Sequence, residues 1–141
     1  MVFISKKVGF FYFFCAIIVL IVTILSFIFS SYAFSPVSLE VSERVLENII
    51  RLDGVLFGFT AIMTSLIYRE EKFRGKKFLT LMGWSSISFF CYLLAIFMSF
   101  SFLMSQTQDY QIFVPVILTC FGGLCSSIYM ILTIIEQEKK E

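Results

Sequence analysis

Residues 8–30 read VGFFYFFCAIIVLIVTILSFIFS, a run of 23 residues without a charged side chain. A helix of about 20 apolar residues is long enough to cross the hydrocarbon core of a bilayer. This run therefore predicts a transmembrane helix. Two further uncharged runs, at 78–104 and 112–135, predict two more.

A fourth uncharged run, at 54–68, has only 15 residues. At the helical rise of about 1.5 Å per residue it is too short to span alone. Extending it backward gives a span over 49–68, which brings Arg51 and Asp53 to the outer edge of the bilayer.

The composition agrees with a membrane protein. The chain is 59% hydrophobic and 15% charged, and its mean hydropathy is +0.93. A net charge of +1 gives no electrostatic reason to expect a nucleic acid partner. There is no His, the residue most used in triads and metal sites, so we expect no enzymatic activity, no cofactor and no metal. The four Cys lie in apolar runs, where we expect them to pack as free thiols.

The first apolar run raises one alternative, a cleaved signal peptide over residues 1–33. Lys6 and Lys7 precede the run, and small residues follow it. Its 23 residues exceed the roughly 7–15 of a signal-peptide core, which favours retention as a helix.

The connection between the first two spans predicts an amphipathic helix over 36–52, outside the cytoplasm and continuous with the second span. Ser35 is the expected N-cap and Pro36 the first helical residue. In two pairs an acidic residue precedes a basic residue by four positions, which is the favourable order for an ion pair within a helix. These pairs are Glu40 with Arg44 and Glu47 with Arg51.

Basic residues are distributed unevenly along the chain. Nine of the eleven Lys and Arg lie in the N-terminal tail, the segment 69–77 and the C-terminal tail. The positive-inside rule places these three segments in the cytoplasm. We therefore predict that both termini are cytoplasmic and that the membrane is the plasma membrane.

The spans also have two-sided helical faces. In the second span, Asp53, Gly54, Gly58, Thr60 and Thr64 share one side, opposite bulky apolar residues. Gly54 and Gly58 form a G-x-x-x-G pattern, which permits close helix packing in bilayers. Three further faces carry small or hydroxyl residues: Gly9, Tyr12, Ala16, Val19, Thr23, Ser26 and Ser30 in the first span; Thr80, Ser88, Cys91, Ala95 and Ser99 in the third; and Pro115, Thr119, Gly122, Ser126 and Thr133 in the last, where Val114, Leu124 and Ile128 are expected opposite.

These faces recur about every 3.5 residues, a period typical of left-handed crossings. Short connections after the second and third spans favour packing between consecutive helices. The predicted fold is an all-α integral membrane protein, an antiparallel four-helix transmembrane bundle.

Asp53 is the one acid joined to a spanning face, and ionisable groups in spans mark functional hypotheses. It either anchors the helix among the lipid headgroups or takes part in transport. Arg51 lies about 200° away around the helix and is not expected to pair with it.

Two functions compete. The favoured one is a non-enzymatic accessory or interaction subunit whose partners are membrane lipids and either further copies of the chain or a membrane complex. The alternative is an oligomeric small-solute transporter or channel, with Asp53, Thr60 and Thr64 of the second span and Thr119 and Ser126 of the last lining the route.

Overall fold

The computed structural model describes residues 2–69 and 76–138, and the helices in these ranges are joined by short connections. Five helical elements follow in order: α1 (Val2–Ala33), α2 (Leu39–Arg69), α3 (Lys76–Met104), the short 3₁₀ helix η2 (Tyr110–Ile112) and α4 (Phe113–Glu138). Four segments are long and apolar enough to cross a membrane: Phe10–Ala33, Leu39–Leu66, Leu79–Met104 and Tyr110–Glu136. The prediction of four helices that are long and apolar enough to span a membrane is therefore confirmed.

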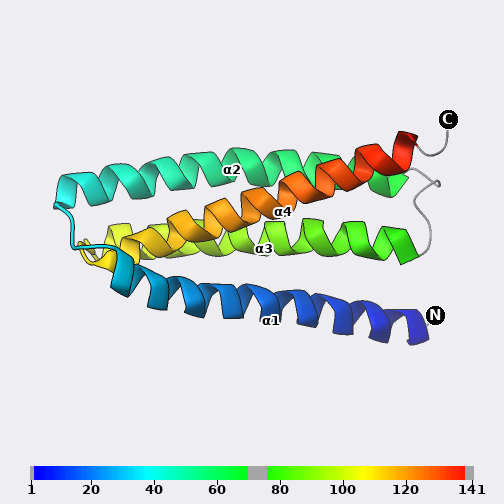
Figure 1. The fold of residues 1–141 in the computed structure, drawn as a ribbon, viewed down its shortest axis with the longest axis horizontal. Coiled ribbons are helices and arrows are strands. Elements are labelled where there is room, and N and C mark those ends of the chain that lie inside the picture. Colours follow the sequence, from blue (N-terminus) through cyan, green and yellow to red (C-terminus); the bar gives the residue numbers. More distant parts are fainter. Residues whose placement is uncertain (1, 70–75, 139–141) are drawn as a thin grey trace.

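Helix α3 is the centre of the arrangement. It lies between α1 and α2, and α4 lies across it (Figure 1). Its contacts with α4 and α2 are the most extensive in the bundle, and α1 packs less extensively. Consecutive helices are antiparallel, so α2 and α4 run in the same direction. The start of α1 and the end of α4 therefore lie at the same end of the bundle.

Helix α2 continues without interruption from the polar connection into the second span, as predicted. Its start differs from the prediction, because the helix begins at Leu39 and its cap is Ser38 instead of Ser35. The Ser38 hydroxyl accepts a bond from the Val41 amide at 3.4 Å. The amide of Val37 instead pairs with the Gln108 carbonyl at 3.0 Å. The residues after Pro36 are thus held by the connection between α3 and α4.

A second link joins the same two connections. The Ser42 hydroxyl, in the first turn of α2, donates to the Thr107 carbonyl at 2.6 Å. Thr107 follows a Schellman turn at the end of α3, in which Gln106 has a positive φ of 52° and the Thr107 amide bonds to the Phe102 carbonyl. These bonds fix the level of α2 relative to the end of α3.

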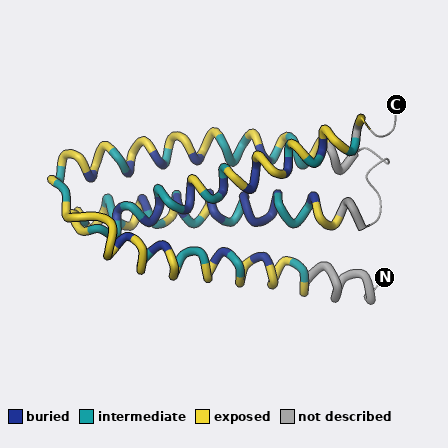
Figure 2. Tube along the Cα trace, viewed as in Figure 1, coloured by how far each residue is buried: buried dark blue, intermediate teal, exposed yellow. Residues whose placement is uncertain are grey.

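Burial follows the helix faces, with the deepest positions on α3 and the inward sides of its neighbours (Figure 2). The predicted inner face of α4 is confirmed, because all five of its residues are buried while Leu124 and Ile128 are exposed. Val114 was placed on the outer side, and this was wrong: it is fully buried. Phe34, just after α1, stacks on the Phe113 ring at 4.1 Å and closes this end of α4.

Helix α1 follows its predicted face only in part. Val19, Ser26 and Ser30 are buried, whereas Tyr12 and Ala16 are exposed and Cys15 is buried instead. This agrees with the smaller contact of α1 with the rest of the bundle.

All four cysteines are free thiols, as predicted. Cys15, Cys91 and Cys125 are buried in the core and Cys120 is exposed on α4.

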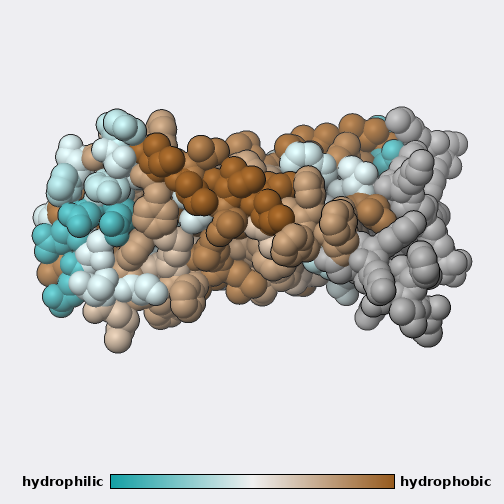
Figure 3. All heavy atoms as spheres, turned by 90° about the horizontal axis from the view of Figure 1, so that it is seen from below, coloured by the Kyte–Doolittle hydropathy of each residue, from teal (hydrophilic) through white to brown (hydrophobic). Residues whose placement is uncertain are grey.

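The outer surface is mainly apolar. Seen from the α1 side, apolar residues cover the middle of the bundle, and hydrophilic residues collect at the end that holds the α1–α2 connection (Figure 3). Such a belt matches a protein surrounded by lipid. Most of the predicted basic segment 69–77 and the basic C-terminal tail lie outside the described residues.

Candidate functional site

The structure brings together the polar residues that the sequence placed on the second and fourth spans. Asp53, on the inner face of α2, is fully buried. Its Oδ2 accepts a hydrogen bond from the Thr119 hydroxyl of α4 at 2.9 Å. Thr119 Oγ1 also lies 2.9 Å from the Pro115 carbonyl, so two acceptors compete for one hydroxyl proton.

The second oxygen of Asp53, Oδ1, is buried without a hydrogen-bond partner among the described residues. Arg51 does not compensate this carboxyl group, because its side chain is exposed and lies 3.7 Å from Glu47. The ion pairs predicted within α2, Glu40 with Arg44 and Glu47 with Arg51, are both present.

Asp53 lies close to the middle of α2 (Leu39–Arg69). Its partner Thr119 is about one turn from Gly122, and a methyl group placed on Gly122 would lie 3.1 Å from Cys91 Cβ. Cys91 is close to the middle of α3 (Lys76–Met104). Asp53 is therefore within about two helical turns of the level of the middle of α3, and its side chain faces protein.

A cluster of hydroxyl groups lies two turns further along α2, centred on Ser126 of α4. Ser126 Oγ lies 2.6 Å from Ser88 Oγ, 3.2 Å from Thr60 Oγ1 and 3.3 Å from the Tyr92 hydroxyl, which donates to it. Ser88 also donates to the Gly122 carbonyl at 2.9 Å. Each of the three helices α2, α3 and α4 thus contributes to one hydrogen-bonded set.

The hydroxyl groups continue toward the other end of the bundle. Thr64 Oγ1 donates to the Thr60 carbonyl at 2.8 Å and lies 2.6 Å from Ser85 Oγ of α3. Ser85 and Tyr92 were not identified from the sequence. The signal that could have found them is their helical spacing from Ser88, three and four residues away.

The contacts between α2 and α4 keep one register. Asp53 pairs with Thr119 and Thr60 pairs with Ser126, and both pairs are 66 residues apart in the sequence. A constant offset over seven residues is expected for two parallel helices whose facing residues repeat every heptad.

The glycines of the candidate site have different environments. A methyl group on Gly122 would lie 2.9 Å from Tyr92 Cε1, so this glycine permits the close approach of α3 and α4. A methyl group on Gly54 or Gly58 would meet no described atom within 4 Å. The close approach that their G-x-x-x-G pattern permits is therefore not used inside the described chain.

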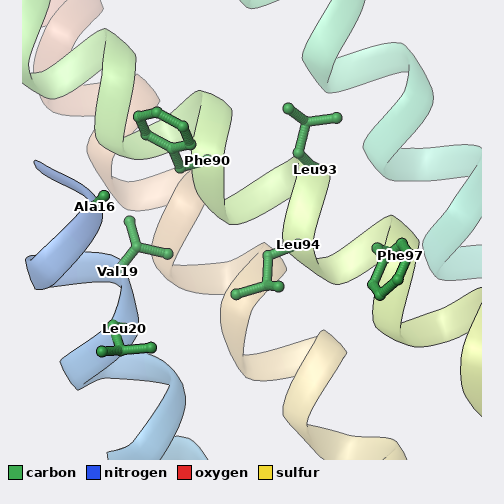
Figure 4. Close-up of a pocket in the computed structure, with 7 residues that line it drawn as sticks. All are labelled: Ala16, Val19, Leu20, Phe90, Leu93, Leu94 and Phe97. Atoms are coloured by element: carbon green, nitrogen blue, oxygen red, sulfur yellow. The ribbon is translucent and has the colours of Figure 1, made fainter. Parts of the chain in front are cut away.

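Several grooves open on the surface of α3, and two of them adjoin α1 or the hydroxyl groups. The larger of these two, of about 430 Å³, lies between α1 and α3 and is lined by apolar side chains that include Leu20, Phe90 and Phe97 (Figure 4). The smaller, of about 240 Å³, reaches Thr64 and Ser85, so the hydroxyl cluster touches the lateral surface there. The side chains that line the groove between α1 and α3 are all apolar.

The chemistry that this arrangement can support is limited. One carboxylate and a set of neutral hydroxyls can hold helices together or contact a small cation. Within residues 2–69 and 76–138, no group of three or more Cys, Asp or Glu is placed to hold a metal ion. Comparison of the chain with family models, curated proteins and solved structures gives no significant match.

Proposed function

We propose that this multi-pass membrane protein is non-enzymatic and acts by interaction within the membrane, as an accessory subunit or by self-association. The observation that carries the proposal is that four polar side chains at the centre of the bundle bond to one another. Thr60, Ser88, Tyr92 and Ser126 form a closed set between three helices, buried from the surface. What remains for contact with other molecules is the outer surface of the helices.

The described connections outside the spans support the same proposal. Residues 34–38 and 105–109 are short and are bonded to each other through Val37 and Gln108. They are too short to form a separate binding domain. Recognition would therefore involve the helices themselves or the ends of the bundle.

The proposed orientation places both termini and the segment 69–77 in the cytoplasm of a plasma-membrane protein. Its support is the excess of basic residues in those segments. Reporters fused at the N-terminus, at the C-terminus and within 105–109 test it. A cytoplasmic signal from the two terminal fusions and an external signal from the third are expected, and the reverse pattern would overturn the orientation.

Affinity purification of the tagged full chain in mild detergent tests the interaction function. We expect a reproducible assembly larger than one chain, together with no flux of ions or small solutes when the purified chain is reconstituted in liposomes. A chain that stays monomeric and conducts a solute would contradict the proposal.

A second function, an oligomeric transporter or channel, is favoured by one specific observation. Asp53 Oδ1 is a buried, unpartnered carboxylate oxygen, and the hydroxyl groups of Thr60 and Thr64 continue from it along α2. Such a group could contact a passing cation. If flux is found in liposomes and Asp53→Asn abolishes it while the protein remains folded, this second function replaces the first.

A further inference from the structure

The outer face of α2 carries a regular row of residues, most of which are exposed. We call it the α2 seam; its residues are spaced alternately by four and three positions. They are Glu40, Arg44, Glu47, Arg51, Gly54 and Gly58. All are exposed except Gly58, which is half-buried. Alternating spacings of three and four are those of a helix face that packs against another helix.

The glycine half of the seam is open. No described atom lies within 4 Å of a methyl group built on Gly54 or Gly58. A second helix backbone could therefore approach there without displacing any side chain. Glycines four residues apart in a span are the usual place for such an approach.

The charged half of the seam lies beside apolar surface. Thr64 pairs with Ser85 and Ser42 with Thr107, so the antiparallel arrangement of α2 and α3 places Arg51 near the level of Phe97. By the same register Glu47 lies at the level of Phe102.

Phe97 is 70% exposed, as expected for a side chain facing lipid, and Phe102 is half-buried. Charged side chains at the same level are unfavourable against acyl chains. The charged side chains of the α2 seam would therefore be more stable against a polar protein surface than against lipid tails.

The signs of the charges indicate which protein surface could contact the α2 seam. Along the seam the charges alternate, acid, base, acid and base, and they sum to zero. Each Arg lies within one turn of a Glu, with Arg44 2.6 Å from Glu40 and Arg51 3.7 Å from Glu47. A second seam placed alongside in parallel brings each residue to the level of its own copy, and it offers each Arg a Glu of the other copy about one turn away.

We propose that the α2 seam is the contact surface for a second copy of this chain, with the two copies related by a two-fold axis along the membrane normal. Copies inserted with the same topology meet with parallel α2 helices, as such an axis requires. The glycines bring the two helices together, and Arg51 of each copy reaches Glu47 of the other. This inference rests on the proposed interaction function and names its partner.

The glycine contact is tested with Gly58→Ile in the full chain, labelled with donor or acceptor fluorophores and reconstituted in liposomes at several protein-to-lipid ratios. Gly123→Ile is the matched control, because Gly123 is a helical glycine on α4 that also has no described atom within 4 Å of its added methyl. We expect Gly58→Ile to weaken association by roughly tenfold or more and the control to leave it unchanged. Circular dichroism checks that both variants remain helical.

The charge contact is tested without changing helix packing. Glu47→Arg makes the central pair of one chain wholly basic, and Arg51→Glu makes it wholly acidic. Each variant alone is expected to associate more weakly than the native chain, whereas a mixture of the two is expected to recover association through pairs of unlike charge. Recovery in the mixture is a result that a purely structural role of either residue does not produce.

The outcomes separate this inference from the function on which it rests. Equal association of the native chain, Gly58→Ile and Gly123→Ile would overturn the seam as the contact surface, as would a mixture no better than its components. A native chain that is monomeric in liposomes but is recovered with a different membrane protein would overturn the second copy and keep the interaction function. Flux from an isolated monomer would overturn both.

Discussion

Replacing Gly122 by Ala tests whether the close approach of α3 and α4 holds the core together. A methyl group on Gly122 would lie 2.9 Å from Tyr92 Cε1 and 3.1 Å from Cys91 Cβ. Both neighbours are fully buried. The Tyr92 hydroxyl is bonded to Ser126, and Cys91 Cβ is attached directly to the backbone of α3. Neither can give way unless α3 and α4 move apart.

The magnitude follows from two opposing effects. Overpacking a well-filled core costs about 1–3 kcal/mol, while Ala favours a helix over Gly by about 1 kcal/mol. Gly123→Ala gains the helix propensity of Ala without overpacking, because its added methyl meets no described atom within 4 Å. The difference in free energy of unfolding between the two variants therefore isolates overpacking. We expect Gly122→Ala to be less stable than Gly123→Ala by about 1–3 kcal/mol.

The measurement is reversible unfolding of the purified chain by sodium dodecyl sulfate in mixed micelles, followed by circular dichroism. Both variants are compared with the native chain under the same conditions. If the two alanine variants agree within about 0.5 kcal/mol, the packing at Gly122 is looser than described and the reasoning fails.

Three further predictions concern single interactions in the same unfolding measurement. Ser126→Ala removes the centre of the hydroxyl cluster and is expected to lower stability by about 1–2 kcal/mol, whereas Ser127→Ala, on the exposed face, should stay within about 0.5 kcal/mol of the native chain. Thr119→Val removes the one donor to Asp53 and is expected to cost about 1–2 kcal/mol; the loss should shrink in an Asp53→Asn background, and an equal loss in both would show that the two side chains do not interact. Phe34→Ala removes a ring stacked on the start of α4 and is expected to cost about 1 kcal/mol or more, with no loss if that stacking is unimportant.

Much of the fold could be predicted from the sequence because lipid imposes simple requirements. Three uncharged runs longer than a bilayer thickness have few other interpretations. The face of small and hydroxyl residues predicted the buried side of α4, since bulky apolar residues are favoured against lipid. On α2 the same reasoning placed Asp53 and Thr60 correctly but was wrong for Gly54, which is exposed. The exceptions lie where tertiary contacts decide. Val114 belongs to the buried core cluster, and α2 begins only at Leu39, after Val37 has bonded to the α3–α4 connection.

The candidate site was predictable in its α2 and α4 members and less so in α3. Thr60 and Ser126 lie on clear helical faces, and the structure joins them directly at 3.2 Å. The face of α3 is broad because it contacts neighbours on several sides, so periodicity does not distinguish Ser85 and Tyr92 from other buried residues. That Asp53 faces Thr119 depends on the relative level of two helices, which the sequence of either one does not contain.

The 66-residue separation of Asp53 and Thr119 has a consequence for how the protein is made. At synthesis rates of about 5–20 residues per second, α2 leaves the ribosome roughly 3–13 s before its partner on α4 exists. During that interval the carboxyl group of Asp53 has no Thr119 hydroxyl to accept from, although α3 is already available. The interior of the bundle therefore becomes complete only when the last helix enters the membrane, and chains truncated before residue 119 are expected to be removed by quality control.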